Sequence, residues 1–437
     1  MSTIAVIGAG YVGLSSAVGL AHLGHDVIAF DVDQSRVDSL NEGIPPFYEE
    51  RLEELLREGI GRGRLRFQLM EKADLADREF VLLCLPTPQG SNGAADVSAI
   101  KSAVEKFSST LAKGAVVINK STATVGTTRW VVDRLRDHPV SVVSNPEFLQ
   151  EGRALTEFLK GERLLIGADD PIAADRVKNL YAGTGVPVIS TSIESAELAK
   201  YACNTFLATK LSFVNSIAEL CEKMGADITE VAAVMGSDSR IGKKFLSAGP
   251  AWGGPCLPKD SRALLHMAEN ANIKFTVLEA AVKANEESIE HVVAKVLRLF
   301  NNELKGISIG VWGLTFKAGT DDIRDSPAVD IVNRLISEGA NVSVFDPMHK
   351  TSLKGAVAAT NAYDACIDAH ALVILTEWPE FAATDLTQVA TLMTGRVIVD
   401  TRNIVSADAA LSAGFRYLAT GRQTRDATPD LGNAWVE

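Results

Sequence analysis

The segment Gly253–Asp260 combines the residue types of a reactive loop. It reads Gly-Gly-Pro-Cys-Leu-Pro-Lys-Asp, so glycines and prolines constrain the backbone around Cys256, and Lys259 and Asp260 follow closely. A neighbouring ammonium group favours the thiolate, which is the nucleophilic form of cysteine. The spacing alone is compatible with a catalytic nucleophile and with a buried structural thiol, so both interpretations stay open at this point.

Lys200 and Asn204 form a second pair that could do chemistry. They lie four residues apart in a stretch of helical periodicity, so they share one face of the expected helix. An ammonium group beside an amide suits the stabilisation of a developing oxyanion. The alternative is that Lys200 forms a surface ion pair with Glu197, worth roughly a few tenths of a kcal/mol.

Acidic and hydroxyl side chains follow two of the expected strands. Glu147 and Glu151 come directly after one strand, and Thr122 follows another. Ligands of parallel sheets bind at the carboxyl ends of the strands, so these side chains are candidates for acid–base work and for holding a water. Structural alternatives are a carboxylate in the first turn of a helix for Glu147 and a helix cap for Thr122.

The N-terminal segment Ile4–Gly13 predicts a dinucleotide site. A short apolar strand runs into Gly-Ala-Gly-Tyr-Val-Gly and then into a helix. Gly8 permits the tight turn, Gly10 lets the backbone approach a pyrophosphate, and Gly13 allows close packing of helix on strand. The N–H groups and dipole of the helix N-terminus complete an anion site.

Asp31 and Arg36 bear on which dinucleotide is bound. Asp31 ends the next expected strand, where an acid accepts hydrogen bonds from the ribose hydroxyls of NAD and repels the phosphate of NADP. Arg36 lies one turn into the following helix and could meet a 2′-phosphate. With Asp31 present we expect NAD, and we expect Arg36 to stack on the adenine or to pair with an acid.

The elements that position these side chains fall into three segments. In the first, short β-branched runs alternate with amphipathic stretches, which predicts a parallel sheet covered on both faces. The expected strands are Thr3–Ile7, Asp26–Phe30, Phe80–Leu85, Ala115–Asn119, Val140–Ser144, Arg163–Ile166 and Val186–Ile189.

Helical periodicity replaces strand signals from about Ser195 to Ile289. Ile193–Met224 is expected to be one long helix, a spine between domains or a dimer interface. The alternation then returns, with strands expected at Ser308–Trp312, Asn341–Phe345, Ala371–Leu375 and Val397–Asp400. We therefore expect domains at residues 1–192, 193–300 and 301–437.

Composition excludes several classes of protein. The chain has 437 residues, 46% hydrophobic and 22% charged, with a net charge of −12. This opposes non-specific binding to nucleic acid or to anionic membranes. No apolar run reaches the ~18 residues of a membrane span, and the N-terminus lacks a signal-peptide pattern. The five scattered cysteines predict neither a disulfide framework nor a metal site, and they favour a reducing cytoplasm.

Taken together, these motifs resemble the UDP-glucose/GDP-mannose dehydrogenase family over nearly the whole chain. The stretches that carry the resemblance are Gly8–Gly13 with Asp31, Leu85–Pro88, Lys120–Thr128, Asn145–Gly152, Glu197–Asn204, Arg240–Gly242, Gly253–Asp260, Gly313–Pro327 and Asp400–Asn403. The resemblance implies two Rossmann-like, doubly wound parallel-sheet α/β domains, joined by a central all-helical segment. The last domain would bind the nucleotide of a nucleotide sugar.

The chemistry that the resemblance implies is a four-electron oxidation of a sugar C6 hydroxyl to the uronate with two NAD+. It would proceed through a cysteine thiohemiacetal and a thioester. UDP-glucose is the substrate expected first, and GDP-mannose, a UDP-N-acetylhexosamine or dTDP-glucose are the alternatives. A homodimer through the central helix is also implied.

The resemblance assigns roles by position. Cys256 would be the nucleophile, Lys200 and Asn204 would stabilise oxyanions, and Asp260 would orient the attacking water or the lysine. Thr122, with Glu147 or Glu151, would serve the acid–base steps. NAD would contact Gly8, Gly10, Tyr11, Val12, Gly13, Asp31, Arg36, Pro86, Thr87, Thr122, Glu151, Lys259 and Arg324. The nucleotide sugar would contact Glu147, Phe148, Leu149, Glu151, Lys200, Asn204, Arg240, Phe245, Leu246, Gly249, Gly253, Cys256, Phe316 and Lys317. Arg240 would reach the partner's substrate across a dimer interface.

Departures from the family pattern concern specificity. Trp252 stands where tyrosine is frequent, and Pro255 replaces a small residue such as serine, so both are candidates for contacts with the sugar. Two other classes fit less well. A two-electron dehydrogenase of the 6-phosphogluconate or hydroxy-acid type would need neither Cys256 nor a second α/β segment. A non-enzymatic NAD sensor would have lost a catalytic position, and none is missing.

Overall fold

The computed structural model describes residues 1–90, 93–350 and 353–427. The chain divides into two compact units. One comprises Met1–Cys203 with Arg262–Ile273, and the other comprises Asn204–Ser261 with the chain from Lys274 onward. The expected division into domains at 1–192, 193–300 and 301–437 stays a prediction, and residues 428–437 of the last domain lie outside the described residues.

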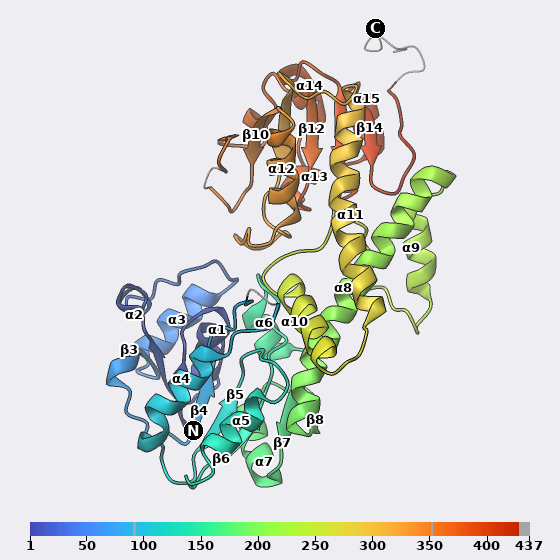
Figure 1. Ribbon diagram of the computed structural model, residues 1–437. Coiled ribbons are helices and arrows are strands. Elements are labelled where there is room, and N and C mark those ends of the chain that lie inside the picture. The colour runs from blue at the N-terminus through green and yellow to red at the C-terminus, as the bar shows by residue number, and fades with distance from the viewer. Residues whose placement is uncertain (91–92, 351–352, 428–437) are drawn as a thin grey trace. The chain divides into compact units, whose positions relative to one another are not determined.

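The first unit is built on an eight-stranded sheet in the order β3-β2-β1-β4-β5-β6-β7-β8 (Figure 1). Its first six strands have the order typical of a Rossmann fold. The strands are β1 Thr3–Ile7, β2 Asp26–Asp31, β3 Leu65–Leu69, β4 Phe80–Leu83, β5 Val116–Asn119, β6 Ser141–Ser144, β7 Leu164–Ala168 and β8 Val188–Thr191.

Two features of this sheet differ from the expectation. The edge strand β3 was not predicted, although Leu65, Phe67 and Leu69 alternate with polar residues. Neighbouring strands are parallel except β6 and β7, which pair antiparallel. The connection through α6, residues 145–163, begins and ends at the same end of the sheet, as an antiparallel pair requires.

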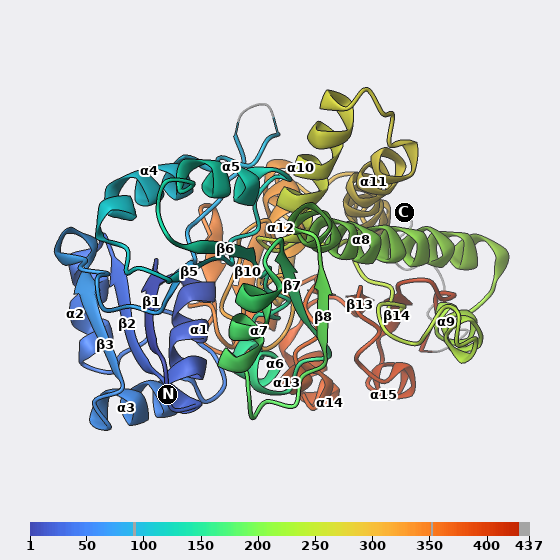
Figure 2. The same ribbon diagram turned by 90° about the horizontal axis from the view of Figure 1, so that it is seen from below.

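Helices cover both faces of this sheet. Residues Ile4 and Val6 of β1 face the core formed with α1, α2, α3, α6 and α7, whereas Ala5 and Ile7 face the core formed with α4 and α5 (Figure 2). The strand alternation places successive side chains in opposite cores, as a doubly covered sheet requires. These helices are α1 Tyr11–His22, α2 Gln34–Asn41, α3 Leu52–Gly61, α4 Ser98–Phe107, α5 Thr127–Arg134, α6 Ala154–Lys160 and α7 Pro171–Leu180.

The long helix α8 spans Ile193–Met224, as predicted, and its C-terminal part belongs to the second unit. Val214, Ala218 and Cys221 on α8 pack against Ile228 of α9. The remaining helices of the central region are α9 Ile228–Ser237, α10 Leu257–Asn270 and α11 Thr276–Leu299.

The second unit contains a six-stranded parallel sheet in the order β11-β10-β9-β12-β13-β14, which repeats the Rossmann order. Helices α11 and α12 pack on one face and α13, α14 and α15 on the other. Bounds are β9 Ser308–Trp312, β10 Asn341–Phe345, β11 Ala356–Ala358, β12 Ala371–Ile374, β13 Val397–Asp400, β14 Arg416–Ala419, α12 Pro327–Ser337, α13 Pro379–Ala382, α14 Leu386–Leu392 and α15 Ala407–Ser412.

The two-sheet α/β architecture with a long central helix is therefore confirmed. The short strands β11 and β14 were not predicted. Among the described residues, no helix is long and apolar enough to cross a membrane.

Candidate active site

The glycine turn between β1 and α1 has room for a pyrophosphate. Gly8 has φ +96°, and a Cβ there would lie 2.5 Å from the Cys84 carbonyl oxygen. A Cβ on Gly13 would lie 1.8 Å from the Gly8 carbonyl oxygen, so helix and strand pack too closely for any side chain. A Cβ on Gly10 would meet nothing within 4 Å, which leaves open space at the N-terminus of α1.

Asp31 closes this turn from the end of β2. Its carboxylate accepts the Ala9 N–H at 2.9 Å and the Asp33 N–H at 3.1 Å. Arg36 pairs with Asp31 at 3.1 Å, so it meets an acid, which is one of the two roles expected for it beside NAD. The open glycine turn and the strand-end carboxylate fit NAD.

Glu49, to which the sequence assigned no role, holds the turn at the end of Asn145–Gly152. The Glu49 carboxylate is 5% exposed and accepts hydrogen bonds from the Tyr11 hydroxyl, the Gly152 N–H and, at 2.8 Å, the Ala154 N–H. Burial and the contact with Glu49 raise the pKa of Tyr11 well above its usual range. Tyr11 thus fastens α1 to this turn as a hydroxyl donor, and no motif around Glu49 signals this.

Glu147 and Lys200 form a buried ion pair in the first unit. The Lys200 ammonium lies 3.0 Å from the Glu147 carboxylate, and the two side chains are 5% and 8% exposed. Burial alone would raise the pKa of Glu147. The charge and hydrogen bond of Lys200, with the Leu149 N–H at 2.6 Å and the charge of Lys120, lower that pKa overall. Glu147 is therefore held as a carboxylate.

The structural alternatives for these residues do not hold. Glu197 accepts the Gly126 and Thr128 N–H groups, each at 2.7 Å, at the start of α5, whereas Lys200 pairs with Glu147. Glu147 lies outside any helix, so it is not a first-turn acid. The residue at the N-cap of α5 is Gly126, so Thr122 is not the cap.

Thr122 and Thr87 join the loops that follow β5 and β4. The Thr87 hydroxyl donates to the Thr122 carbonyl at 2.6 Å, and Ser121 binds the main chain of Leu85. The predicted residues of the first unit therefore gather at the carboxyl ends of the strands of one sheet. They are Gly8–Gly13, Asp31, Arg36, Pro86, Thr87, Thr122, Glu147–Glu151 and Lys200.

In the second unit, Cys256 directly precedes α10 and its side chain is exposed. The N-terminal end of a helix favours a thiolate through its N–H groups and dipole. By contrast, burial raises the pKa of both Cys84 and Cys366 to about 12. Of the two interpretations of Cys256, the buried structural thiol is therefore excluded.

Asp260 forms a buried centre one turn after Cys256. It is 1% exposed, and it accepts from the Asn204 amide and from the Lys259 ammonium, each at 2.6 Å. The Asp260 N–H donates to the Cys256 carbonyl at 2.9 Å. The Asp260 carboxylate thus fixes the orientation of the Asn204 amide and pairs with Lys259. Lys200, one turn before Asn204 on α8, pairs instead with Glu147.

The loop after β9 carries the residues expected to bind the nucleotide of the sugar. Asp346, directly after β10, accepts the Leu314 N–H at 2.8 Å, as Asp31 accepts the Ala9 N–H in the first sheet. Lys317 lies over the Phe316 ring, and the Arg324 guanidinium is exposed beside Asp322. Two cationic side chains, Lys317 and the Asp322-paired Arg324, therefore lie in this loop at the carboxyl end of the second sheet.

Arg402, to which no role was assigned from the sequence, adds a cation at this edge. It is paired with Glu377 at 3.1 Å and donates to the Phe316 carbonyl at 3.3 Å. A Cβ on Gly249 would lie 2.9 Å from the Arg402 guanidinium, so Arg402 packs against the loop Phe245–Gly249, which is expected to contact the sugar.

The other residues expected to contact the sugar differ in exposure. Phe245 begins this loop with φ +61°, and Leu246 is buried. Arg240 is exposed and paired with Asp238.

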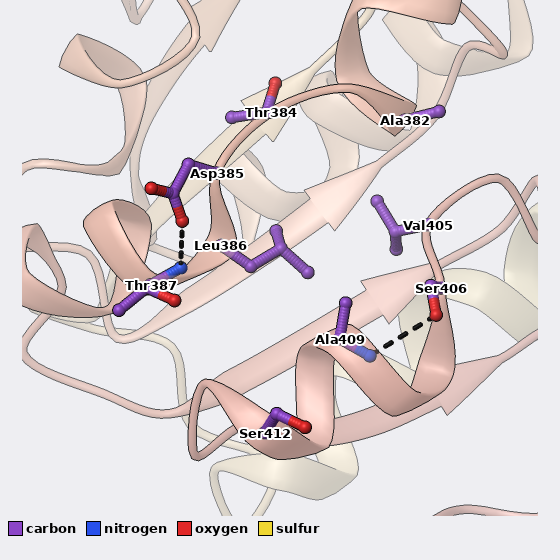
Figure 3. A pocket seen from close by; sticks show the side chains of 9 residues that line it. All are labelled: Ala382, Thr384, Asp385, Leu386, Thr387, Val405, Ser406, Ala409 and Ser412. Carbon is purple, nitrogen blue, oxygen red and sulfur yellow. Dashed lines mark hydrogen bonds between the residues drawn. The ribbon is translucent and has the colours of Figure 1, made fainter.

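A separate cavity in the second unit, of roughly 330 Å³, contains none of the predicted site residues (Figure 3). Two of its polar side chains cap helices, since Asp385 accepts the Thr387 N–H and Ser406 accepts the Ala409 N–H. It is therefore not the candidate active site.

Comparison with known proteins finds one family along most of the chain. Three models of the UDP-glucose/GDP-mannose dehydrogenase family match: the NAD binding domain at residues 2–184, the central domain at 194–287 and the UDP binding domain at 310–407. The chain is 40% identical to UDP-glucose 6-dehydrogenase TuaD of Bacillus subtilis (strain 168), covering 97% of this chain and 94% of that protein. It is 38% identical to the UDP-glucose 6-dehydrogenase of Rickettsia bellii (strain RML369-C), covering 96% and 99%.

Solved structures agree. A UDP-glucose dehydrogenase from the hyperthermophilic archaeon Pyrobaculum islandicum superimposes with a TM-score of 0.88 at 33% identity, covering 97% of this chain and 98% of that one. A UDP-D-ManNAc dehydrogenase from Pyrococcus horikoshii gives 0.86 at 27% identity, covering 96% and 99%. The chain therefore belongs to the UDP-glucose/GDP-mannose dehydrogenase family, and it is an NAD-dependent nucleotide-sugar dehydrogenase.

Proposed function

We propose that the enzyme converts UDP-glucose, two NAD+ and water to UDP-glucuronate and two NADH. The observation that carries this proposal is Cys256, an exposed thiol on a constrained loop beside the buried Asp260 centre. The choice of UDP-glucose rests on the relatives that bear this substrate in their names.

The proposed reaction uses Cys256 as a covalent catalyst. NAD+, when bound at the Gly8–Gly13 turn, supplies a hydride acceptor for each of two successive oxidations at C6. The Cys256 thiolate adds to the aldehyde carbon left by the first oxidation and forms a thiohemiacetal. The second oxidation turns this adduct into a thioester. Water then adds to the thioester carbonyl and the thiol leaves, which yields the carboxylate. In all, three protons are released for each sugar.

The charged residues have separate tasks in this proposal. The Lys200 ammonium and the Asn204 amide stabilise negative charge on the C6 oxygen. Glu147 is ionised, so we assign it the role of proton acceptor, with Thr122 holding the water, and Glu151 is the alternative. Asp260 orients the Asn204 amide. We assign Lys317, Arg324 and Lys259 to the diphosphate groups, to which their ammonium and guanidinium groups can donate charge-assisted hydrogen bonds.

The test is the number of NADH formed per molecule of limiting nucleotide sugar. We would compare UDP-glucose, GDP-mannose, UDP-N-acetylglucosamine and dTDP-glucose, each with NAD+ and NADP+. Two equivalents from UDP-glucose with NAD+ are expected, and the variant Cys256→Ala should yield no uronate. One equivalent from the native enzyme would contradict the thioester route, and two equivalents from another sugar would move the substrate assignment to that sugar.

Another nucleotide sugar is the second candidate, because the UDP-D-ManNAc dehydrogenase from Pyrococcus horikoshii is also similar over 96% of this chain. The reaction sequence at Cys256 would be the same. The substrate panel above separates the two candidates, since only the productive sugar gives two NADH.

We also propose a homodimer formed through α8. Apolar side chains Phe206, Phe213, Leu220 and Met224 are 67%, 55%, 49% and 76% exposed. They repeat on one face at helical spacing, and such a stripe suits a second copy of the same helix. A cytoplasmic location, as expected from the sequence, completes the proposal and is tested by cell fractionation.

A further inference from the structure

The loop that leads to Cys256 is fastened on the side of α11 by a single amide. Asn285, on α11 and 8% exposed, accepts the Trp252 N–H through Oδ1 at 2.8 Å. Its Nδ2 donates to the Trp252 carbonyl at 2.9 Å. One side chain thus satisfies both main-chain groups of Trp252, as the peptide of a neighbouring strand would. Only a side-chain amide offers a donor and an acceptor in this arrangement.

The indole of Trp252 is fastened as well, between α8 and α11. The ring is 6% exposed, and its Nε1 donates to the Ser212 hydroxyl of α8 at 2.8 Å. That hydroxyl in turn donates to the Ala281 carbonyl of α11 at 2.6 Å. The side chain therefore points into the helical layer. The sequence suggested that Trp252 contacts the sugar. The buried position of its ring, which packs between α8 and α11, does not support that contact.

The opposite side of the loop is held by the segment after β9. The Gly254 N–H donates to the Asp325 carbonyl at 3.1 Å. A Cβ on Gly253 would lie 2.1 Å from that same oxygen, and a Cβ on Gly254 would lie 2.7 Å from the Phe316 ring. Gly254 also has φ +82°, a conformation that other residues rarely adopt. The loop backbone is thus enclosed on both sides.

We propose that Asn285 and Trp252 are positioning residues that set the place of the Cys256 thiol for attack on the sugar aldehyde. This inference rests on the proposed function. Only Gly253, Gly254 and Pro255 lie between Trp252 and Cys256, and the segment after β9 holds one side of this stretch through Gly254. The anchor at Trp252 holds the other side, so a shift of Trp252 would be passed along this short stretch to Cys256. A displacement of the nucleophile by about 1 Å is enough to cost a large part of the rate.

Cys256 acts only once the aldehyde exists, so a loosened anchor slows the second oxidation more than the first, whereas a general loss of stability slows both alike. The variant Asn285→Asp keeps the acceptor for the Trp252 N–H but replaces the donor with a carboxylate facing the Trp252 carbonyl. The variant Trp252→Phe keeps the main-chain pair with Asn285 and an aromatic side chain, but it removes the bond to Ser212 and leaves part of the indole's volume empty.

Asn41 provides a matched control for Asn285. At the end of α2 it makes the same two-way pair, with Nδ2 donating to the Phe67 carbonyl at 3.0 Å and Oδ1 accepting the Phe67 N–H at 3.1 Å. It lies in the first unit and has no assigned role in binding or catalysis. The variant Asn41→Asp therefore makes the same chemical change at a pair of main-chain hydrogen bonds that lies in a different part of the chain from Cys256.

The experiment follows single turnovers with UDP-glucose and NAD+ by stopped flow and resolves the first and second NADH. In Asn285→Asp and Trp252→Phe we expect the second phase to slow by about tenfold or more relative to the first, with KM values within about threefold of the native enzyme. Asn41→Asp should leave the ratio of the two phases unchanged. Equal slowing of both phases, or an unchanged ratio in the folded Trp252→Phe protein, would overturn the proposal.

The variant Cys256→Ala, run alongside, separates failure of this inference from failure of the proposed function. If Cys256→Ala still forms two NADH per sugar, the covalent route itself is wrong. If Cys256→Ala loses the second NADH while both anchor variants keep the native ratio, Cys256 is the nucleophile and the anchor does not position it. A second readout without turnover is the rate of Cys256 alkylation by iodoacetamide, which should change in both anchor variants and not in Asn41→Asp.

Discussion

Cys256 differs from the other cysteines in its exposure. Cys84, Cys221 and Cys366 are buried and Cys203 is partly buried, and burial raises the pKa of the Cys84 and Cys366 thiols to about 12. Only a thiolate alkylates rapidly. Iodoacetamide near neutral pH should therefore modify Cys256 first, and peptide mass mapping would show it. Labelling of Cys84 before Cys256 in the folded protein would contradict this expectation.

The Glu147–Lys200 pair allows a second prediction at the scale of single residues. The variant Glu147→Gln leaves the Lys200 ammonium buried without its carboxylate, which should lower the free energy of unfolding by about 3 kcal/mol. The double variant Glu147→Gln with Lys200→Met removes both charges and should recover much of this loss. Urea unfolding of the native protein, of Glu147→Gln, of Lys200→Met and of the double variant measures the coupling energy between the two side chains. Additive effects of the two substitutions would show that the pair is not coupled.

At the scale of elements, Glu49 joins α1 to the turn before α6. The variant Glu49→Ala leaves the Gly152 and Ala154 N–H groups and the Tyr11 hydroxyl without their common acceptor. Each lost partner of a buried polar group costs about 1–3 kcal/mol. We expect faster hydrogen exchange at Gly152 and Ala154, with a smaller effect from Tyr11→Phe, which removes one donor. Unchanged exchange at both amides would show that Glu49 does not hold the turn.

Glu222 of α8 makes the stability of the second unit sensitive to acid. Burial alone would raise its pKa, but hydrogen bonds from His291 and Lys295 of α11 and from the Gly421 N–H lower it to about 2 from an ordinary 4.5. Because the folded pKa is the lower one, the stabilisation is complete above about pH 4.5 and is lost as the pH falls towards about 2.

The variant Glu222→Gln tests this acid dependence. It should lower the free energy of unfolding by on the order of 3 kcal/mol near neutral pH and by progressively less in acid. The control is Glu287→Gln, which breaks an exposed pair with Lys283 on α11 and should change stability by less than about 1 kcal/mol. Urea unfolding at several pH values measures both. An equal loss for Glu222→Gln at every pH would contradict the assigned cause.

The periodicity of apolar residues predicted most helices and strands, but it could not predict contacts between segments that are distant in the sequence. The bounds of α8 and β9 follow from apolar spacing, and the glycine turn at Gly8 follows from its motif. The edge strand β3 escaped because its alternation is short, and the antiparallel pairing of β7 depends on how the chain returns. Glu49 and Asn285 carry no local signal, because their roles arise from partners 38 to 105 and 33 residues away.

At the scale of the whole molecule, the same structural arrangement occurs once in each sheet. Each sheet contains six strands in the Rossmann order. In each, an aspartate at or directly after the end of the second strand, Asp31 or Asp346, accepts a main-chain N–H from the loop after the first strand. This repetition places one ligand-binding edge in each unit. On α8, Lys200 and Asn204, to which we assign the stabilisation of oxyanions, belong to different units along one helix.

The apolar stripe on α8 gives the prediction for assembly. A charge placed at its centre by Phe213→Glu would have to be buried unpaired in a dimer, which costs several kcal/mol, so association should be lost. The control is Ile172→Glu, since Ile172 on α7 is 71% exposed and lies outside the stripe. Light scattering after size exclusion should give a dimer mass for the native chain and Ile172→Glu, and half of it for Phe213→Glu. A native monomer at micromolar concentration, or a Phe213→Glu dimer, would exclude this face as the interface.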